Sequence, residues 1–156
     1  MRYPYDPSTS SSSSPARNGW PSSPEDERTG MRILIVDDES VIADSLALIF
    51  RACGFDARTA YSGEDALEIG QSFSPDVLIS DVVMRGITGI ELGIQMRGRF
   101  PACHILLFSG QAATLDLIQA ADTKGYHFDI LTKPVPPQVL LNCVQEYAAQ
   151  LEPKHV

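Results

Sequence analysis

From residue 31 onward the sequence predicts an α/β protein built on a doubly wound, five-stranded parallel sheet. Five short apolar runs alternate with five segments of helical periodicity, and the connections between them are brief. Several of the runs are continuously apolar, as strands buried on both faces require. Right-handed crossovers between parallel strands then place helices on both faces of the sheet.

The first two strand–helix units are marked by the residues that end them. The run Arg32–Val36 is a compact apolar strand that stops at an acid pair. Ser40 is the expected N-cap of the next helix, whose apolar residues recur on one side, and Gly54 is expected just beyond its C-terminus. Asp56–Tyr61 is expected to be a short strand, and Gly63 to about Phe73 a helix with apolar side chains facing inward.

The rest of the chain continues the alternation. Pro75 separates the second helix from the third apolar run, and a loop over residues 82–89 with two glycines separates that run from the third helix. Gly125 ends the fourth helix, and prolines suit the first turn of the last one. The expected elements are the strand Asp76–Ser80, the helix Ile90–Arg99, the strand His104–Phe108, the helix Gln111–Thr123, the strand Tyr126–Leu131 and the helix Pro136–Leu151.

Residues 1–30 differ in composition from everything that follows. They contain the serine run Ser10–Ser14 among several prolines, and such a segment cannot bury enough apolar surface to offset its ordering entropy. We therefore expect a disordered tail at residues 1–30 and one folded domain at residues 31–152. A length of 156 residues with 44% apolar and 21% charged side chains fits a single globular domain.

The charge balance argues against some classes of function. Acidic residues outnumber basic residues by 20 to 12, which gives a net charge of −8 and disfavours a broad nucleic-acid surface. No run approaches the roughly 18 apolar residues of a membrane span, and the N-terminus lacks the apolar segment of a secretory signal. We expect a cytoplasmic protein without direct DNA binding or membrane association.

Polar side chains that follow the apolar strands form the candidate site. Asp37 and Asp38 follow the first strand, Asp81 the third, Ser109 the fourth and Lys133 the fifth. The carboxyl ends of parallel strands meet at one edge of a sheet, where doubly wound proteins bind their ligands. Each residue alone has an ordinary explanation as a turn cap or a solvated loop residue. Their joint occurrence, in order and at matching strand ends, instead predicts one site.

The residue types at this edge suit phosphoryl transfer. Carboxylates close together repel, and Mg²⁺, which prefers hard oxygen ligands and retains several waters, relieves that repulsion. Lys133 supplies a positive charge and Ser109 a hydroxyl donor for phosphoryl oxygens. Asp81 is the expected nucleophile because the other two acids form the adjacent metal pair. The expected magnesium ligands are Asp37, Asp38, Asp81 and the backbone carbonyl of Val83.

Four segments resemble the receiver domain of two-component response regulators: Ile33–Glu39, Pro75–Asp81, Leu107–Gly110 and Leu131–Pro134. The resemblance extends from residue 31 to about residue 151 and implies a flavodoxin-like fold with strand order 2-1-3-4-5. It implies that Asp81 accepts a phosphoryl group, with Mg²⁺ bound, from a histidine kinase or a phosphotransfer protein. It also implies a phosphoacceptor switch, not an enzyme beyond self-catalysed phosphoryl transfer and dephosphorylation. Its output would be protein–protein contacts through about residues 111–151, a face that is also a candidate homodimer surface.

Two positions depart from the family pattern. The proline that usually stands four residues after the phosphorylated aspartate is replaced by Arg85, which puts a flexible cation near the mouth of the site. The family's switch aromatic, three residues before Lys133, is replaced by Ile130. Phe128 shares the strand face of Ile130 and is a candidate substitute.

Other functions are alternatives to the phosphoacceptor hypothesis. The chain ends a few residues after the last helix, which favours a stand-alone receiver. The alternative is a phosphorylation-independent interaction module with a relic acidic edge, which the replacement of the switch aromatic favours. The intact set of five polar residues favours the receiver. A small phosphatase would need a general acid two residues after Asp81, and Val83 cannot serve as one.

Overall fold

The computed structural model describes residues 30–110 and 114–151. The chain divides into two units, Met1–Gly30 and Met31–Val156. The tail expected at residues 1–30 lies outside the described residues except for Gly30, and so does the start of the helix expected from Gln111. No helix in the described part of the chain is long and apolar enough to cross a membrane.

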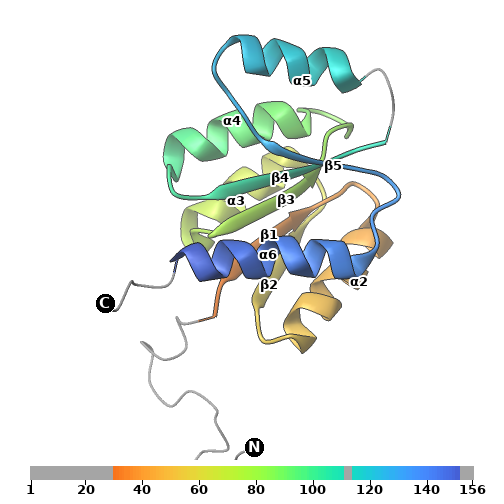
Figure 1. Ribbon diagram of the computed structural model, residues 1–156, viewed down its shortest axis with the longest axis vertical. Coiled ribbons are helices and arrows are strands. Elements are labelled where there is room, and N and C mark those ends of the chain that lie inside the picture. The colour runs from red at the N-terminus through yellow and green to blue at the C-terminus, as the bar shows by residue number, and fades with distance from the viewer. Residues whose placement is uncertain (1–29, 111–113, 152–156) are drawn as a thin grey trace, which may run out of the picture. The chain divides into compact units, whose positions relative to one another are not determined.

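Five strands and five helices alternate along the described residues (Figure 1). The strands are β1 (Arg32–Val36), β2 (Asp56–Ala60), β3 (Val77–Asp81), β4 (His104–Ser109) and β5 (Asp129–Thr132). The helices are α2 (Ser40–Ala52), α3 (Gly63–Phe73), α4 (Gly89–Arg99), α5 (Thr114–Thr123) and α6 (Pro137–Leu151). The strands form one parallel sheet in the order β2-β1-β3-β4-β5. The predicted fold class and strand order are therefore confirmed.

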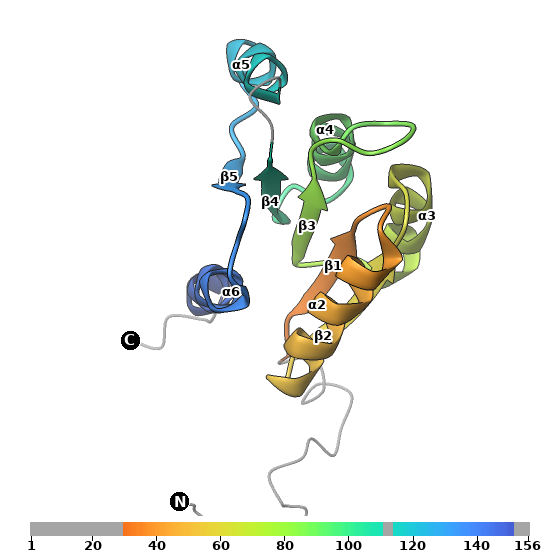
Figure 2. The same cartoon turned by 90° about the vertical axis from the view of Figure 1, so that its right-hand side faces the viewer.

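Apolar layers cover both faces of the sheet because successive strand residues point to opposite sides. In β1, Leu34 and Val36 pack in the layer with α3, α4 and α5, whereas Ile33 and Ile35 pack in the layer with α2 and α6. Figure 2 shows the same separation, with α3 and α4 on one side of the sheet and α6 on the other. All four side chains are at most 1% exposed, which explains why this strand is continuously apolar in sequence.

The N-terminus of α2 differs from the prediction by one residue. The N-cap is Glu39, and Ser40 is already helical. The N–H of Glu39 donates to Asp37 Oδ1 at 2.9 Å, and its carbonyl accepts the N–H groups of Ile42 and Ala43. Asp37, which follows β1, thus holds the backbone of the residue at which the helix begins.

Strand β5 begins at Asp129, three residues later than predicted. Its first partner in β4 is Leu106. Tyr126 and Phe128, expected in the strand, instead stack with ring centroids 6.5 Å apart in the apolar layer that contains α4. Packing of these two rings replaces the extra ladder pairs that a longer edge strand would have made.

The loop between β3 and α4, residues 82–88, closes tightly against its neighbours because two glycines leave room for it. A Cβ atom on Gly89 would lie 2.1 Å from the carbonyl oxygen of Asp81, and the N–H of Gly89 donates to Val82 O at 2.8 Å. A Cβ atom on Gly63, at the start of α3, would lie 2.2 Å from the side chain of Ile87. This loop comes directly after Asp81, the expected nucleophile.

Candidate functional site

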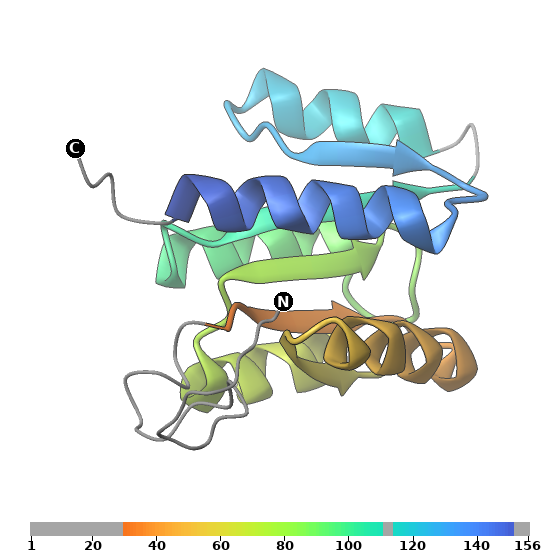
Figure 3. The ribbon, with the colours of Figure 1, turned by 60° about the horizontal axis from the view of Figure 1, so that its bottom comes forward.

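Four adjacent strand ends bring the predicted site residues to one edge of the sheet. Asp81 ends β3 and Ser109 ends β4, while Asp37 and Lys133 are the first residues after β1 and β5. Since β1, β3, β4 and β5 are consecutive in the sheet, these residues come from neighbouring strands. The arrowheads of β1, β3 and β5 in Figure 3 point to this shared edge. Asp38 lies one residue beyond Asp37 on the same connection.

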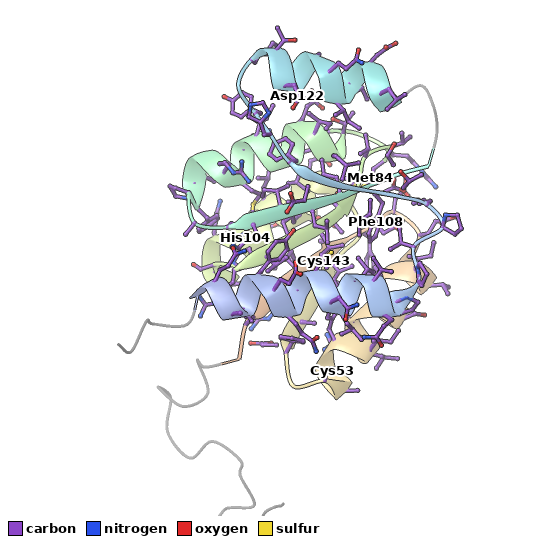
Figure 4. The ribbon with its side chains drawn as sticks, viewed as in Figure 1. Cys53, Met84, His104, Phe108, Asp122 and Cys143 are labelled. Atoms are coloured by element: carbon purple, nitrogen blue, oxygen red, sulfur yellow. The ribbon has the colours of Figure 1, made fainter. Side chains whose placement is uncertain are left out.

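Asp81 makes contacts through both its side chain and its backbone carbonyl. Lys133 Nζ lies 2.8 Å from Asp81 Oδ2, and the two side chains are 36% and 14% exposed. The hydroxyl of Ser80 donates to the carbonyl oxygen of Asp81 at 2.9 Å and lies 3.8 Å from the sulfur of Met84, which is labelled in Figure 4. The carboxylate is thus half-buried, paired with a cation and still open to solvent on one side.

Lys133 is positioned by contacts with the end of β4. Its backbone N–H donates to the carbonyl of Ser109 at 3.0 Å. A Cβ atom on Gly110 would lie 3.0 Å from Lys133 Cδ, so the glycine lets the aliphatic part of the lysine pass close to the backbone. The side chain of Ser109 is only 7% exposed. The end of β4, at Ser109 and Gly110, therefore positions the lysine that reaches Asp81.

Asp37 carries the unusual electrostatics of the site. Its side chain is 2% exposed, Oδ1 accepts the N–H of Glu39 at 2.9 Å, and Oδ2 is buried without a hydrogen-bond partner. Burial raises the pKa of Asp37 above its ordinary value, the N–H of Glu39 opposes this, and the charge of Asp81 raises it further. A cation beside Oδ2 would satisfy the oxygen and relieve the repulsion.

The loop that follows β3 donates backbone hydrogen bonds to the acids. The N–H of Arg85 donates to Asp38 Oδ2 at 3.2 Å, and the N–H of Val83 lies 3.4 Å from Asp81 Oδ1. Val83 is 47% exposed at the opening of the site. These contacts tie the loop to the acid pair on one side and to the strand-end carboxylate on the other.

A polar pocket of about 310 Å³ opens between these groups. Its walls are formed by Asp38, Glu39, Asp81, Val83, Arg85, Gly110 and Lys133. Among the described residues, no three His, Cys, Asp or Glu side chains form a metal site by themselves. The few carboxylates at this pocket therefore do not suit an ion such as Zn²⁺, which takes three or four protein ligands. They fit Mg²⁺, which takes one or two carboxylates and completes its shell with water and carbonyl oxygens.

The response-regulator receiver domain model matches residues 33–145 of the chain. The chain belongs to this family. Relatives include the alkaline phosphatase synthesis transcriptional regulatory protein PhoP of Bacillus subtilis, 31% identical over 107 residues that make up 69% of this chain and 44% of PhoP. The probable transcriptional regulatory protein TcrX of Mycobacterium tuberculosis is 30% identical over 65% of this chain and 43% of TcrX. The chain thus spans about half the length of the curated relatives it matches.

Solved receiver structures share the fold. A CheY-like receiver domain protein from Methanospirillum hungatei matches with a TM-score of 0.71 and 25% identity over 78% of this chain and 95% of that one. The chemotaxis protein CheY4 of Vibrio cholerae matches with a TM-score of 0.67 and 28% identity over 76% of this chain and 98% of CheY4. Receiver domains generally are phosphorylated on an aspartate, bind Mg²⁺ and interact with histidine kinases or phosphotransfer proteins.

This receiver holds Phe128 away from the position of the missing switch aromatic. The Phe128 ring lies over α4, where a Cβ atom on Gly93 would be 3.2 Å from Cζ and the Arg97 guanidinium is 5.1 Å from the ring centroid. The same hypothetical Cβ atom would be 3.1 Å from Ile105, which precedes Ser109 by four residues, or about 13 Å along a strand. Phe128 therefore lies away from Ser109 and does not take the position of Ile130, which pairs with Leu107 of β4.

Two wall residues were not singled out from the sequence. Glu39 and Gly110 line the pocket, each immediately after a residue or pair that was predicted. The signal for Glu39 was its position between the acid pair and a helix start. The signal for Gly110 was a glycine that follows a strand-ending hydroxyl residue.

Proposed function

We propose that this receiver is a phosphoacceptor switch in which Asp81 takes a phosphoryl group from a histidine kinase or a phosphotransfer protein. One observation carries the proposal. The Asp81 carboxylate lies 2.8 Å from the Lys133 ammonium group, beside an acid pair in which Asp37 Oδ2 is buried without a partner. A nucleophile, a countercharge for phosphoryl oxygens and an incomplete cation site therefore come together at one strand edge.

The chemistry assigns a role to each predicted residue. Mg²⁺, when bound, neutralises charge on the transferred group. It would be held directly by Asp38, Asp81 and the backbone carbonyl of Val83, and by Asp37 partly through water. A carboxylate oxygen of Asp81 attacks phosphorus, the bond from phosphorus to the donor histidine nitrogen breaks, and its electron pair stays on the imidazole. Lys133 neutralises developing oxygen charge, and the Ser109 hydroxyl donates to a phosphoryl oxygen. Water later attacks phosphorus and releases inorganic phosphate.

The same proposal covers partners and location. The receiver, residues 31–152, acts in the cytoplasm and passes its signal through protein contacts, without binding DNA itself. The face formed by about residues 111–151 is the proposed contact surface for the downstream protein and for a second copy of the chain. Among the described residues of that face, Leu115 and Leu117 on α5 are 55% and 39% exposed, which suits a protein contact.

Acetyl phosphate tests the acceptor role without the cognate kinase. The full chain incubated with acetyl phosphate and Mg²⁺ is expected to gain the mass of one phosphoryl group, and chelation of Mg²⁺ is expected to prevent the gain. Asp81→Asn is expected to abolish it, because an amide is not a nucleophile of this kind. The matched control is Asp56→Asn, an exposed acid at the start of β2, which should react like the wild type. A wild-type protein that binds Mg²⁺ yet gains no mass would contradict the proposal and favour the phosphorylation-independent interaction module.

A further inference from the structure

Arg85 occupies the pocket wall where the family usually has a proline. Its backbone N–H donates to Asp38 Oδ2 at 3.2 Å, a hydrogen bond that proline cannot make. Arg85 is exposed and lines the same pocket as Asp81 and Lys133. The substitution therefore adds both a backbone donor for the acid pair and a second side-chain cation at the pocket.

The charges that line the pocket suggest what this cation does. Its lining contains three acids, Asp38, Glu39 and Asp81, against two cations, Arg85 and Lys133. Phosphorylation replaces the single charge of a carboxylate with a group of about −1.5 to −2, so it makes the pocket more negative. A guanidinium group, which stays protonated and offers paired N–H donors, suits phosphoryl oxygens particularly well.

The loop that carries Arg85 is held in place on both sides. Gly86, with φ of +79°, turns the chain directly after Arg85, and a Cβ atom there would lie 2.9 Å from the carboxylate of Glu64. On the other side of the turn, Ile87 packs against Gly63 closely enough to exclude a Cβ atom. The start of α3 thus supports the turn, and Arg85 is presented at the pocket from a fixed backbone.

We propose that the Arg85 guanidinium binds the phosphoryl group, first on the donor and then on Asp81, as a second cation beside Lys133. The proposal rests on Asp81 being the acceptor. Arg85 is a binding residue in this scheme, and Lys133 keeps its contact with the carboxylate. The ligand class is a phosphoryl anion, for which acetyl phosphate is the probe.

The first test compares side-chain variants in the full chain. Arg85→Ala keeps the backbone N–H and is expected to raise the acetyl phosphate concentration for half-maximal phosphorylation rate by about three- to ten-fold, the range for an exposed charge-assisted hydrogen bond. Arg85→Lys keeps the charge and should fall between the wild type and Arg85→Ala. Arg99→Ala, an exposed arginine in the last turn of α4, is the matched control and should match the wild type.

Magnesium affinity, measured by calorimetry without any phosphoryl donor, separates binding from loop support. Removal of a cation near the acids should leave the affinity of Arg85→Ala for Mg²⁺ unchanged or tighten it by up to about three-fold. Weaker Mg²⁺ binding would mean that the side chain supports the loop, and it would overturn the proposal. The proposal would also be overturned if the wild type is phosphorylated but Arg85→Ala raises the acetyl phosphate concentration for half-maximal rate by less than about three-fold. A wild type that takes no phosphoryl group would remove the acceptor role and this inference together.

Discussion

Replacement of Asp37 by asparagine removes a buried charge and preserves the shape of the side chain. The asparagine carbonyl oxygen can still accept the N–H of Glu39, which lies 2.9 Å from Asp37 Oδ1. The amide nitrogen takes the place of Oδ2, which is buried without a partner, and can donate to the neighbouring carboxylates of Asp38 or Asp81. We expect Asp37→Asn to be more stable than the wild type in the absence of Mg²⁺.

The magnitude follows from the orphaned oxygen and from the neighbouring charges. An unsatisfied buried polar group costs about 1–3 kcal/mol, and part of that cost returns because the amide also has donors to satisfy. We expect a gain of about 1–2 kcal/mol in the free energy of unfolding, or a rise of several degrees in Tm. Mg²⁺ should reverse the order, because a ligand of the folded state stabilises the protein that binds it and the variant lacks one carboxylate ligand.

The pH dependence has a definite sign. Burial raises the pKa of Asp37 above 3.8, so the folded protein holds this proton more tightly than the unfolded chain does. The ionised form therefore destabilises the fold fully above the raised pKa, and the penalty is relieved as the pH falls through that pKa toward 3.8. The advantage of Asp37→Asn should be greatest near neutral pH and should shrink on acidification.

Urea unfolding followed by circular dichroism, with a chelator present, measures both effects. The curves are compared near neutral pH and near pH 4, and Asp56→Asn serves as an exposed-acid control that should change stability by less than about 0.5 kcal/mol. If Asp37→Asn were less stable than the wild type at neutral pH, the cost assigned to the buried carboxylate would be wrong. An advantage that did not vary with pH would mean that the ionised Asp37 carboxylate is not the source of the cost.

Two further predictions concern the frame of the site. Gly89→Ala places a Cβ atom 2.1 Å from the Asp81 carbonyl oxygen and should cost at least about 2 kcal/mol, whereas Gly98→Ala in the same helix meets nothing within 4 Å and should gain about 0.5–1 kcal/mol. Equal effects in urea unfolding would contradict the close approach. Lys133→Met should slow phosphorylation by acetyl phosphate about a hundred-fold, while stability changes by less than about 1 kcal/mol because the lysine is 36% exposed. A larger stability loss would make the ion pair structural.

The shared edge of the site could be predicted because each strand has its own signal in sequence. The apolar run before Asp81 and the run before Ser109 each stop at a polar residue, and parallel strands must end at the same side. Strand order followed from the resemblance, and the sheet register then places Lys133 one residue past a partner of Ser109. The position of each side chain thus depends on a local pattern and on one topological rule.

The remaining features depend on contacts between distant segments, which no local pattern records. The N–H of Arg85 donates to Asp38, which lies 47 residues earlier, in a loop that turns at Gly86. The start of β5 depends on Tyr126 and Phe128 finding space over α4. In both places tertiary packing, not propensity, decides the backbone path.

The Phe128 ring is held over α4, away from Ser109. To approach Ser109 the ring would have to leave Arg97, a cation–π contact of about 0.5–1 kcal/mol at an exposed site, and abandon its apolar packing on α4. Ile130 is half-buried in the same layer and has neither a ring nor a hydroxyl group to exchange with solvent. By register, Ser109 lies opposite Thr132 and Leu107 lies opposite Ile130, so no residue of β5 brings a ring to this edge. The loop 82–88, by contrast, contacts Asp38 and Asp81 through its backbone and α3 through Ile87, so it joins Asp81 to the rest of the fold by direct contact.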